Sequence, residues 1–312
     1  MDKIWDTLIV GAGPTSLTAA IYTTREDIET VAYEKSAVGG LAAITDMVDN
    51  YPGFPDGIEG LTLADNLEKQ AKRFGTNIEY GDVTAIKDEG DIKIVTVDGE
   101  PVKAKTVLIA TGSDWKKIGV PGEAEFYGRG VHYCATCDGA FYREKKLVVI
   151  GGGNSALQEA IFLTRFSSHI DLLVRSTIKA SDVLQKDIQE YIDNGKITVH
   201  LHTSTEEITS VDKKVTGVRA IKDGQELILE ADGVFVFVGL LPNTQFLAGS
   251  GIELDEVGLI KTNDKLMTNI AGIFAAGDVR HGATMQIASA VGEGATAALS
   301  IREYFDEKRR EA

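Results

Sequence analysis

The chain has 312 residues, enough for about two domains of the usual size. Its composition, 43% hydrophobic and 25% charged, is that of a folded globular protein. The formal charge of −15 argues against a general affinity for nucleic acids or anionic membranes, because such affinity requires excess Lys and Arg. The longest apolar run, residues 234–241, is too short to cross a bilayer, and the N-terminus does not read as a signal peptide. We therefore expect a cytoplasmic protein.

The first pattern along the chain predicts a nucleotide-binding βαβ unit. A short apolar strand meets the turn Gly11-Ala12-Gly13, a helical pattern follows over residues 14–22, and a second strand ends in Glu34. The glycines let the backbone approach a pyrophosphate at the start of the helix, and Glu34 can accept hydrogen bonds from ribose hydroxyls. Ser16 stands where the usual fingerprint has its third glycine, so we expect slightly looser packing of this helix on its strand.

The same pattern recurs from residue 147 onward. An apolar strand meets Gly151-Gly152-Gly153, a helical pattern follows, and the second strand ends at Val174 where the first unit has Glu34. Arg175 and Lys179 follow. Cations at this place suit a 2′-phosphate, so the second unit favours NADPH over NADH; the alternative is a solvated strand end with scattered charge.

The sequence's two cysteines, Cys134 and Cys137, lie between these units. A structural zinc site usually needs a second cysteine pair, and haem attachment needs a His at the position of Asp138. A reversible dithiol–disulfide pair remains, and Asp138 can manage the proton that thiolate chemistry requires. We interpret His132 as a structural or partner-facing residue.

Two nucleotide units and a two-electron dithiol imply an electron path. Nicotinamide delivers hydride and a disulfide accepts electrons through a thiolate, and a flavin connects the two chemistries. We therefore expect FAD at one unit and the donor nucleotide at the other. Later in the chain, apolar strands end in Thr111-Gly112 and Gly277-Asp278, residues 286–302 are compatible with a helix, and the charged residues 306–312 predict a frayed end.

Residues 268–278 resemble the second FAD signature of flavoproteins that have two dinucleotide-binding domains. Together with the run at 134–139, they make the chain resemble the low-molecular-weight, bacterial-type thioredoxin reductases, class II of the FAD pyridine-nucleotide-disulphide oxidoreductases, over nearly its whole length. The resemblance implies an α/β fold of two Rossmann-like, three-layer domains, the second inserted into the first. Residues 1–115 and 246–312 would bind FAD, and residues 116–245 would form a pyridine-nucleotide-binding-like domain that carries the redox disulfide.

The resemblance also implies roles for single residues. Cys137 would exchange electrons with the flavin, Cys134 would attack the disulfide of thioredoxin or a thioredoxin-like protein, and Asp138 would serve as acid and base. A rotating inserted domain, a homodimer and no metal are expected. The predicted FAD-binding residues are Gly11, Gly13, Pro14, Thr15, Glu34, Lys35, Gly40, Leu41, Asn50, Val83, Thr111, Gly112, Asp278, Gln286 and Ile287. The predicted NADPH-binding residues are Gly151, Gly153, Asn154, Ser155, Arg175 and Lys179.

Two departures from the family pattern leave the electron donor open. The family's 2′-phosphate clamp, His-Arg-Arg-x-x-x-Arg, is eroded to Arg175 and Lys179, and Met285 replaces the usual Arg before Gln286. NADPH is one expectation. The alternatives are the same disulfide reductase fed by ferredoxin or another low-potential donor, and a flavin redox sensor without turnover.

Overall fold

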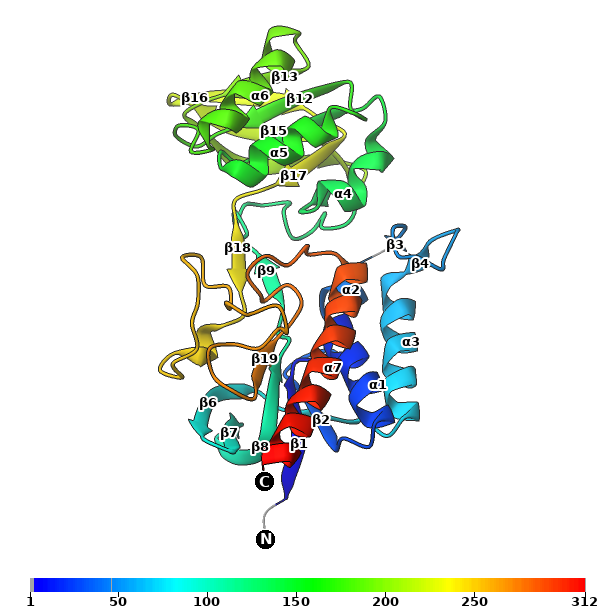
Figure 1. Ribbon diagram of the computed structural model, residues 1–312. Coiled ribbons are helices and arrows are strands. Elements are labelled where there is room, and N and C mark those ends of the chain that lie inside the picture. The colour runs from blue at the N-terminus through cyan, green and yellow to red at the C-terminus, as the bar shows by residue number, and fades with distance from the viewer. Residues whose placement is uncertain (1–2, 46, 312) are drawn as a thin grey trace. The chain divides into compact units, whose positions relative to one another are not determined.

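The computed structural model describes residues 3–45 and 47–311. The chain forms two compact units (Figure 1): one contains the chain up to Asp114 and again from Leu241, and the other is Trp115–Leu240. The chain passes between them twice. The two crossing segments, β9 (Ser113–Trp115) and β18 (Leu240–Pro242), pair in a two-stranded sheet.

A mixed sheet forms the centre of the first unit. Its strands β5, β2, β1 and β8 are parallel, β6 and β7 continue from β8 as an antiparallel meander, and β19 pairs in parallel with the last residues of β8. The strands are β1 (Ile4–Val10), β2 (Thr30–Glu34), β5 (Asn77–Tyr80), β6 (Val83–Glu89), β7 (Ile92–Val97), β8 (Glu100–Ile109) and β19 (Ile273–Ala275).

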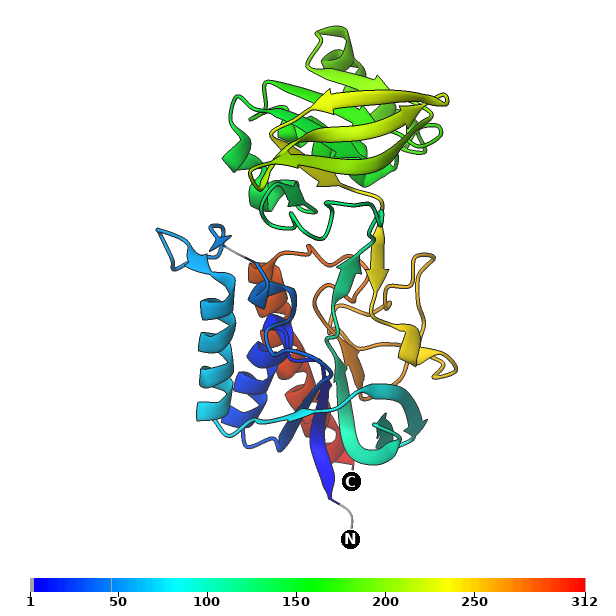
Figure 2. The same cartoon turned by 180° about the vertical axis from the view of Figure 1, so that it is seen from behind.

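Both faces of this sheet are buried, as the alternation of side chains along β1 requires. Ile9 packs with the residues under the helices, whereas Leu8 and Val10 pack on the opposite face with Ile252 and Ile260. Figures 1 and 2 show the three long helices together on one side of the sheet. These helices are α1 (Pro14–Arg25), α3 (Gly60–Arg73) and α7 (Ile287–Glu311).

The turn between β1 and α1 depends on glycine. Gly11 has φ +98°, and a Cβ there would lie 2.7 Å from the carbonyl oxygen of Ala110. Pro14 then starts the helix, where a missing N–H costs nothing. Ser16 is fully buried, and the close approach comes instead from α7, because a Cβ on Gly294 would lie 2.3 Å from the Thr15 carbonyl oxygen.

The second unit has three layers. A parallel sheet in the order β10-β17-β11-β12-β13 lies between helices α5 and α6 and an antiparallel sheet of β14, β15 and β16. The elements are β10 (Val131–His132), α4 (Ala135–Asp138), the 3-10 helix η1 (Gly139–Tyr142), β11 (Lys146–Ile150), α5 (Asn154–Leu163), β12 (His169–Leu173), α6 (Asp182–Asp193), β13 (Ile197–His200), β14 (Thr203–Val211), β15 (Lys214–Lys222), β16 (Gln225–Glu230) and β17 (Gly233–Val236). The α/β fold with two Rossmann-like domains is therefore confirmed.

The expectation of a frayed C-terminal end is wrong for the described residues. The last helix, α7, continues to Glu311; within its final turns Arg309 pairs with Asp306 at 3.5 Å, and Lys308 pairs at 3.5 Å with Asp91, between β6 and β7. Ala312 lies outside the described residues. The remaining elements of the first unit are α2 (Gly40–Ala43), β3 (Met47–Val48), β4 (Ile58–Glu59) and the 3-10 helix η2 (Gln245–Leu247).

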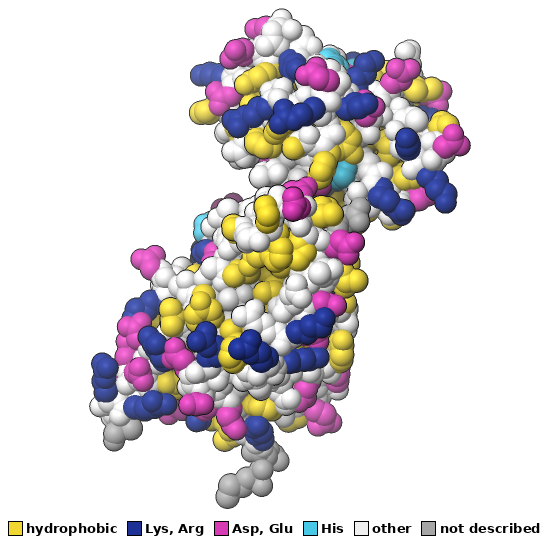
Figure 3. Space-filling view, turned by 90° about the vertical axis from the view of Figure 1, so that its right-hand side faces the viewer, with side chains coloured by type: hydrophobic (Ala, Val, Ile, Leu, Met, Phe, Trp, Pro, Cys, Tyr) yellow, Lys and Arg dark blue, Asp and Glu magenta, His cyan; other side chains and the backbone are white. Residues whose placement is uncertain are grey.

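No helix in the described part of the chain is both long and apolar enough to span a membrane. On the face in Figure 3, acidic and basic side chains are interspersed rather than gathered into one basic patch. The face therefore lacks the concentrated positive charge typical of nucleic-acid-binding surfaces.

Candidate functional site

Two cavities in the first unit adjoin at the carboxyl ends of its parallel strands. Their volumes are about 330 and 340 Å³, and they share five lining residues: Gly11, Glu34, Lys35, Thr111 and Asn243. The larger continues along the start of α1 to α7, and the smaller continues toward β6. Together they form an elongated groove, which we call the dinucleotide groove.

Most of the predicted FAD-binding residues line this groove. They come from six separate parts of the chain: the glycine turn with the start of α1, the end of β2, the start of α2, the start of β6, the residues after β8, and the loop that leads into α7. Those in the larger cavity are Gly11, Gly13, Pro14, Thr15, Glu34, Lys35, Gly40, Leu41, Thr111, Gly112, Asp278, Gln286 and Ile287, and Val83 lines the other cavity.

Asn50 is the predicted residue that does not line either cavity. Its exposed side chain donates a hydrogen bond of 3.0 Å to Oε1 of Gln286, so it reaches the groove through that residue. Met285, which replaces the family's Arg, precedes Gln286 with a left-handed backbone, φ +55°.

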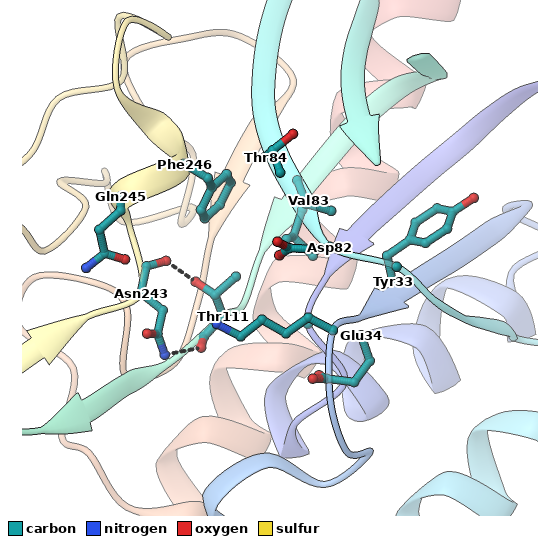
Figure 4. Close-up of a pocket in the computed structure, with 13 residues that line it drawn as sticks. Tyr33, Glu34, Asp82, Val83, Thr84, Thr111, Asn243, Gln245 and Phe246 are labelled. Carbon is teal, nitrogen blue, oxygen red and sulfur yellow. Dashed lines mark hydrogen bonds between the residues drawn. The ribbon is translucent and has the colours of Figure 1, made fainter. Parts of the chain in front are cut away.

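Asn243 is a groove residue that sequence reasoning missed. Its backbone carbonyl accepts a hydrogen bond of 2.7 Å from the Thr111 hydroxyl, and its side-chain amide donates one of 3.0 Å to the Thr111 carbonyl (Figure 4). Figure 4 shows Asn243 and Phe246 on one side of Thr111, and Tyr33 and Glu34 on the other. Its two bonds join residues 132 positions apart, which a local sequence pattern does not indicate.

Glu34 closes the glycine turn from the end of β2. Its buried carboxylate accepts the Ala12 N–H at 2.8 Å through Oε2, and the backbone N–H and hydroxyl of Ser36 through Oε1. Each carboxylate oxygen has two acceptor positions, so Glu34 retains capacity for a ribose hydroxyl.

Asp278 carries an unusual carboxyl group in the groove. Burial, and then the negative charge of Glu293, raise its pKa to about 6. Glu293 accepts a hydrogen bond from Gly277 N–H at 2.8 Å and holds Arg280 in a two-point ion pair, which fixes this loop against α7. Among the described residues no donor bonds the Asp278 carboxylate, so its acceptor capacity is available to a ligand.

The groove fits a dinucleotide. A Cβ on Gly13 would meet nothing within 4 Å, so the backbone at the start of α1 is open, and the first turn of α1 has no acidic side chain. Unpaired N–H groups at a helix start favour a pyrophosphate. Glu34 and Asp278 supply acceptors for hydroxyl groups on either side.

In the second unit, the segment that follows β12 is hydrogen-bonded to the predicted nucleotide turn. Gly151 and Gly153 lie between β11 and α5, and Asn154 and Ser155 are the first two residues of α5. The backbone N–H of Lys179 donates a hydrogen bond of 2.7 Å to the Gly152 carbonyl, and Ser181 N–H donates one of 2.8 Å to Asn154. The side chains of Arg175 and Lys179 are exposed.

Cys134 and Cys137 form a disulfide at the start of α4. The sulfur of Cys134 accepts the Cys137 N–H at 3.1 Å. Asp138 ends α4, and Oδ2 of its side chain lies 3.1 Å from Nδ1 of His132.

Comparison with known proteins agrees with this geometry. Residues 5–294 match the pyridine nucleotide-disulphide oxidoreductase family. The chain is 42% identical to thioredoxin reductase of Bacillus subtilis (98% of this chain, 96% of the relative) and 40% identical to that of Treponema pallidum (98% and 99%). The crystal structure of thioredoxin reductase from Streptococcus pyogenes superposes with a TM-score of 0.92 at 38% identity, covering 98% of this chain and all of that one.

The protein is thus an oxidoreductase with two Rossmann-like domains and a redox-active disulfide. The chain belongs to the pyridine nucleotide-disulphide oxidoreductase family, whose thioredoxin reductases it resembles over its full length and whose cofactor is FAD.

Proposed function

We propose that this enzyme reduces the disulfide of thioredoxin or a thioredoxin-like protein. The observation that carries the proposal is the Cys134–Cys137 disulfide, with Asp138 directly after it, in a chain whose other unit holds a dinucleotide groove. Full-length similarity to proteins named thioredoxin reductase supports the same substrate.

When bound, FAD supplies two electrons to one protein disulfide in each catalytic cycle. We propose that the groove residues bind it: Gly11, Gly13 and the start of α1 face its pyrophosphate, and Glu34 and Asp278 accept bonds from its hydroxyl groups. Cys137 is the sulfur that receives electrons, and Cys134 is the one that attacks the substrate disulfide. The N–H that points at Cys134 supports this division.

The exchange with substrate balances within the named groups. The Cys134 thiolate attacks one sulfur of the substrate disulfide, and the Cys137 thiolate then attacks Cys134, which releases the substrate as a dithiol and restores Cys134–Cys137. Two electrons and two protons pass to the substrate. A pair that must cycle in this way suits a reducing compartment, so we assign the protein to the cytoplasm. The expected homodimer stays a prediction.

Replacing one sulfur tests the substrate assignment. Cys134→Ser should abolish thioredoxin reduction, while the protein still binds FAD and the flavin can still be reduced. The Cys137→Ser variant is the matched control, because it should retain a Cys134 that traps thioredoxin in a mixed disulfide. Full activity in Cys134→Ser would refute the assignment. Multiple turnovers by the unmodified enzyme would rule out a redox sensor without turnover.

For the electron donor we propose NADPH, bound at the Gly151–Ser155 turn with Arg175 and Lys179 at its 2′-phosphate. One observation favours ferredoxin or another low-potential donor: two exposed cations replace a clamp of several guanidinium groups, and Lys179 is also held to Gly152 through its backbone. Anaerobic titration with NADPH, NADH and reduced ferredoxin, followed by bleaching of the visible flavin band, decides between them. Rapid bleaching by micromolar NADPH would remove the alternative.

A further inference from the structure

A buried carboxylate in the second unit joins the first residues of this unit to the residue before the disulfide. Oε1 of Glu123 accepts the Tyr133 hydroxyl at 2.7 Å and the Ile118 N–H at 2.9 Å, and Oε2 accepts the Gly119 N–H at 2.7 Å. Glu123 is 3% exposed and Tyr133 is 4% exposed. A carboxylate that is buried to this degree needs several hydrogen-bond donors, and these three groups supply them.

The hydroxyl and the ring of Tyr133 are held by different groups. Burial, followed by the hydrogen bond to Glu123, raises the pKa of Tyr133, so its hydroxyl stays protonated and donates to the carboxylate. The ring stacks on Trp115 with centroids 5.8 Å apart and meets Tyr127 at 5.6 Å, and Nζ of Lys117 lies 4.2 Å from its centroid. A Phe at position 133 would therefore keep the ring contacts and lose only the hydrogen bond.

Glu123 lies in a turn that is fixed to β14. The Pro121 carbonyl accepts the backbone N–H of Ile208, a residue of β14, at 3.0 Å. Gly122 has φ +87°, and a Cβ there would lie 2.4 Å from the carbonyl oxygen of Ile208, so the turn approaches the strand as closely as only glycine allows. The carboxylate is thus carried by backbone that is itself hydrogen-bonded to a sheet.

Tyr133 connects a paired strand to the first cysteine. β10 ends at His132, which pairs with Phe235 of β17, and Cys134 is the extended residue before α4, with φ −139°. Tyr133 is the one residue between the two. Once the disulfide is reduced, no covalent bond fixes Cys134 relative to Cys137. The anchored Tyr133 then limits how far Cys134 can move.

We propose that Glu123 is a positioning residue of the dithiol centre: by holding the Tyr133 hydroxyl, it keeps the sulfur of Cys134 within reach of the sulfur of Cys137 after reduction. This inference deepens the proposed function and rests on it. In the mixed disulfide, the Cys137 thiolate attacks Cys134 and the bond between Cys134 and the substrate sulfur breaks. The substrate leaves with two electrons, and its departing thiolate takes up a proton from solvent.

Restricting the movement of Cys134 has two effects on this step. It raises the effective concentration of one sulfur at the other, so the attack by Cys137 is faster. It also lowers the conformational entropy that the dithiol gains over the disulfide, so the closed pair is harder to reduce. Both effects should be lost together when the hydrogen bond between Glu123 and Tyr133 is removed.

The first test is the equilibrium of the enzyme disulfide with dithiothreitol, which needs no thioredoxin. FAD-loaded enzyme is equilibrated anaerobically in mixtures of reduced and oxidised dithiothreitol, where each enzyme disulfide that is reduced forms one molecule of the oxidised reagent. After acid quenching and alkylation, mass spectrometry counts the thiols. Since the sequence has only two cysteines, the count reports on this pair alone. The variants are Tyr133→Phe, Glu123→Gln and the double variant.

We expect Tyr133→Phe to raise the ratio of dithiol to disulfide about tenfold, which makes the midpoint potential about 30 mV less negative. Glu123→Gln should act in the same direction, because an amide accepts the hydroxyl more weakly than a carboxylate does. The double variant should shift the ratio no further than the larger single change, since both residues act through one bond. The matched control is Glu207→Gln, which makes the same change in the same unit at a carboxylate bonded to Arg219 at 3.1 Å, and should leave the ratio unchanged.

The second test measures the release of substrate. Reduced, FAD-loaded enzyme is mixed with oxidised thioredoxin, and the mixed disulfide is trapped by acid at successive times. We expect Tyr133→Phe to release thioredoxin from the mixed disulfide about tenfold more slowly than the unmodified enzyme, and release at the unmodified rate would overturn the proposal. An unmodified enzyme that reduces no thioredoxin refutes the proposed function instead, and the dithiothreitol equilibrium still decides the role of Glu123.

Two further results would overturn the proposal. One is a ratio of dithiol to disulfide that is unchanged or lowered in Tyr133→Phe, and the other is a double variant in which the two single effects add. Flavin content and melting temperature verify that each variant is folded holoprotein. If Glu123→Gln does not accumulate, Tyr133→Phe decides alone: a raised ratio supports the proposal and an unchanged one overturns it.

Discussion

Val174 and Glu34 lie at the end of the second strand of their respective βαβ units. Val174 packs against Gly152, whereas Glu34 accepts a hydrogen bond from the backbone of Ala12. A Cβ on Gly152 would lie 2.7 Å from a methyl group of Val174, whereas Glu34 accepts the Ala12 N–H at 2.8 Å. The two βαβ units therefore close the same turn by different means, one by apolar contact and one by a charged acceptor. This difference predicts that the first turn, unlike the second, depends on a carboxylate.

Glu34→Gln should accordingly destabilise the first unit. The amide keeps the volume of the carboxylate but weakens its bonds to Ala12 and Ser36, and hydrogen bonds to a charged group contribute about 2 kcal/mol. We expect the free energy of unfolding in urea to fall by roughly that amount, and FAD affinity to fall as well. The control is Glu29→Gln, a largely exposed residue near the start of β2, which should change neither quantity. Unchanged FAD affinity in Glu34→Gln would contradict the proposed ribose contact.

Gly13→Ala should separate folding from cofactor binding. Its φ of −78° suits any residue and a Cβ there meets no protein atom, so the variant should fold normally. The added methyl group would stand in the groove where a pyrophosphate approaches, and we expect FAD affinity to fall about tenfold, equivalent to about 1.4 kcal/mol. Fluorescence titration of the flavin-free protein with FAD measures this affinity.

Gly153→Ala is the matched control for this substitution. Gly153 occupies the same place before α5, with φ −94° and no atom within 4 Å of an added Cβ. Gly153→Ala should leave FAD affinity unchanged and, if NADPH is the donor, should weaken the binding of NADPH. An equal fall in FAD affinity in both variants would argue against the assignment of the first unit as the flavin site.

We expect the carboxyl group of Asp278 to destabilise the flavin-free protein at neutral pH and to stop doing so in mild acid. Its pKa rises from the usual 3.8 to about 6 in the folded state because of burial and the charge of Glu293. A raised carboxyl pKa means that the folded state binds more protons, so this group destabilises the fold above pH 6, by at most about 3 kcal/mol, and the penalty disappears as the pH falls to 4.

The difference between Asp278→Asn and the unmodified protein isolates this effect. We expect the variant to be more stable by up to about 3 kcal/mol at pH 7.5 and about equally stable at pH 4. Urea unfolding of the flavin-free proteins across this range measures the difference. A stability difference that does not vary with pH would contradict the buried, ionised state of Asp278.

Removing both cations after β12 should report on the electron donor. The double variant Arg175→Ala and Lys179→Ala should weaken NADPH binding by one to two orders of magnitude if these residues hold the 2′-phosphate, since each charge-assisted contact contributes roughly 1.5 kcal/mol. The rate with reduced ferredoxin is the internal control and should not fall. Equal NADPH-driven flavin reduction with and without the two cations would remove them from the donor site.

Local patterns were enough to predict the parts of the site that local chemistry determines. The glycine turns, the strand that ends in Glu34 and the cysteine pair each follow from short runs of sequence, because a turn with φ +98° at Gly11 requires glycine. Asn243 could not be found in this way. Its bonds to Thr111 join residues 132 positions apart, and such pairing depends on the return of the chain after an entire inserted unit.

Side-chain pairing was the other limit of sequence reasoning. The charged residues after 305 read as a frayed end, yet Lys308 and Arg309 find acidic partners that extend α7. His132 reads as a structural or partner-facing residue, and the structure shows a hydrogen bond of 2.7 Å between its Nε2 and the hydroxyl of Tyr142 at the end of η1. Periodicity does not reveal such contacts, because they depend on which elements meet in three dimensions.

The pairing of β19 with β8 and the packing of α7 on α1 have a consequence for biosynthesis. Trp115–Leu240 is translated before either β19 or α7. All strands and helices of the inserted unit are therefore available before the discontinuous unit is complete, since that unit needs the last part of the chain. Premature termination after Leu240 would yield a folded insert attached to an unfinished host.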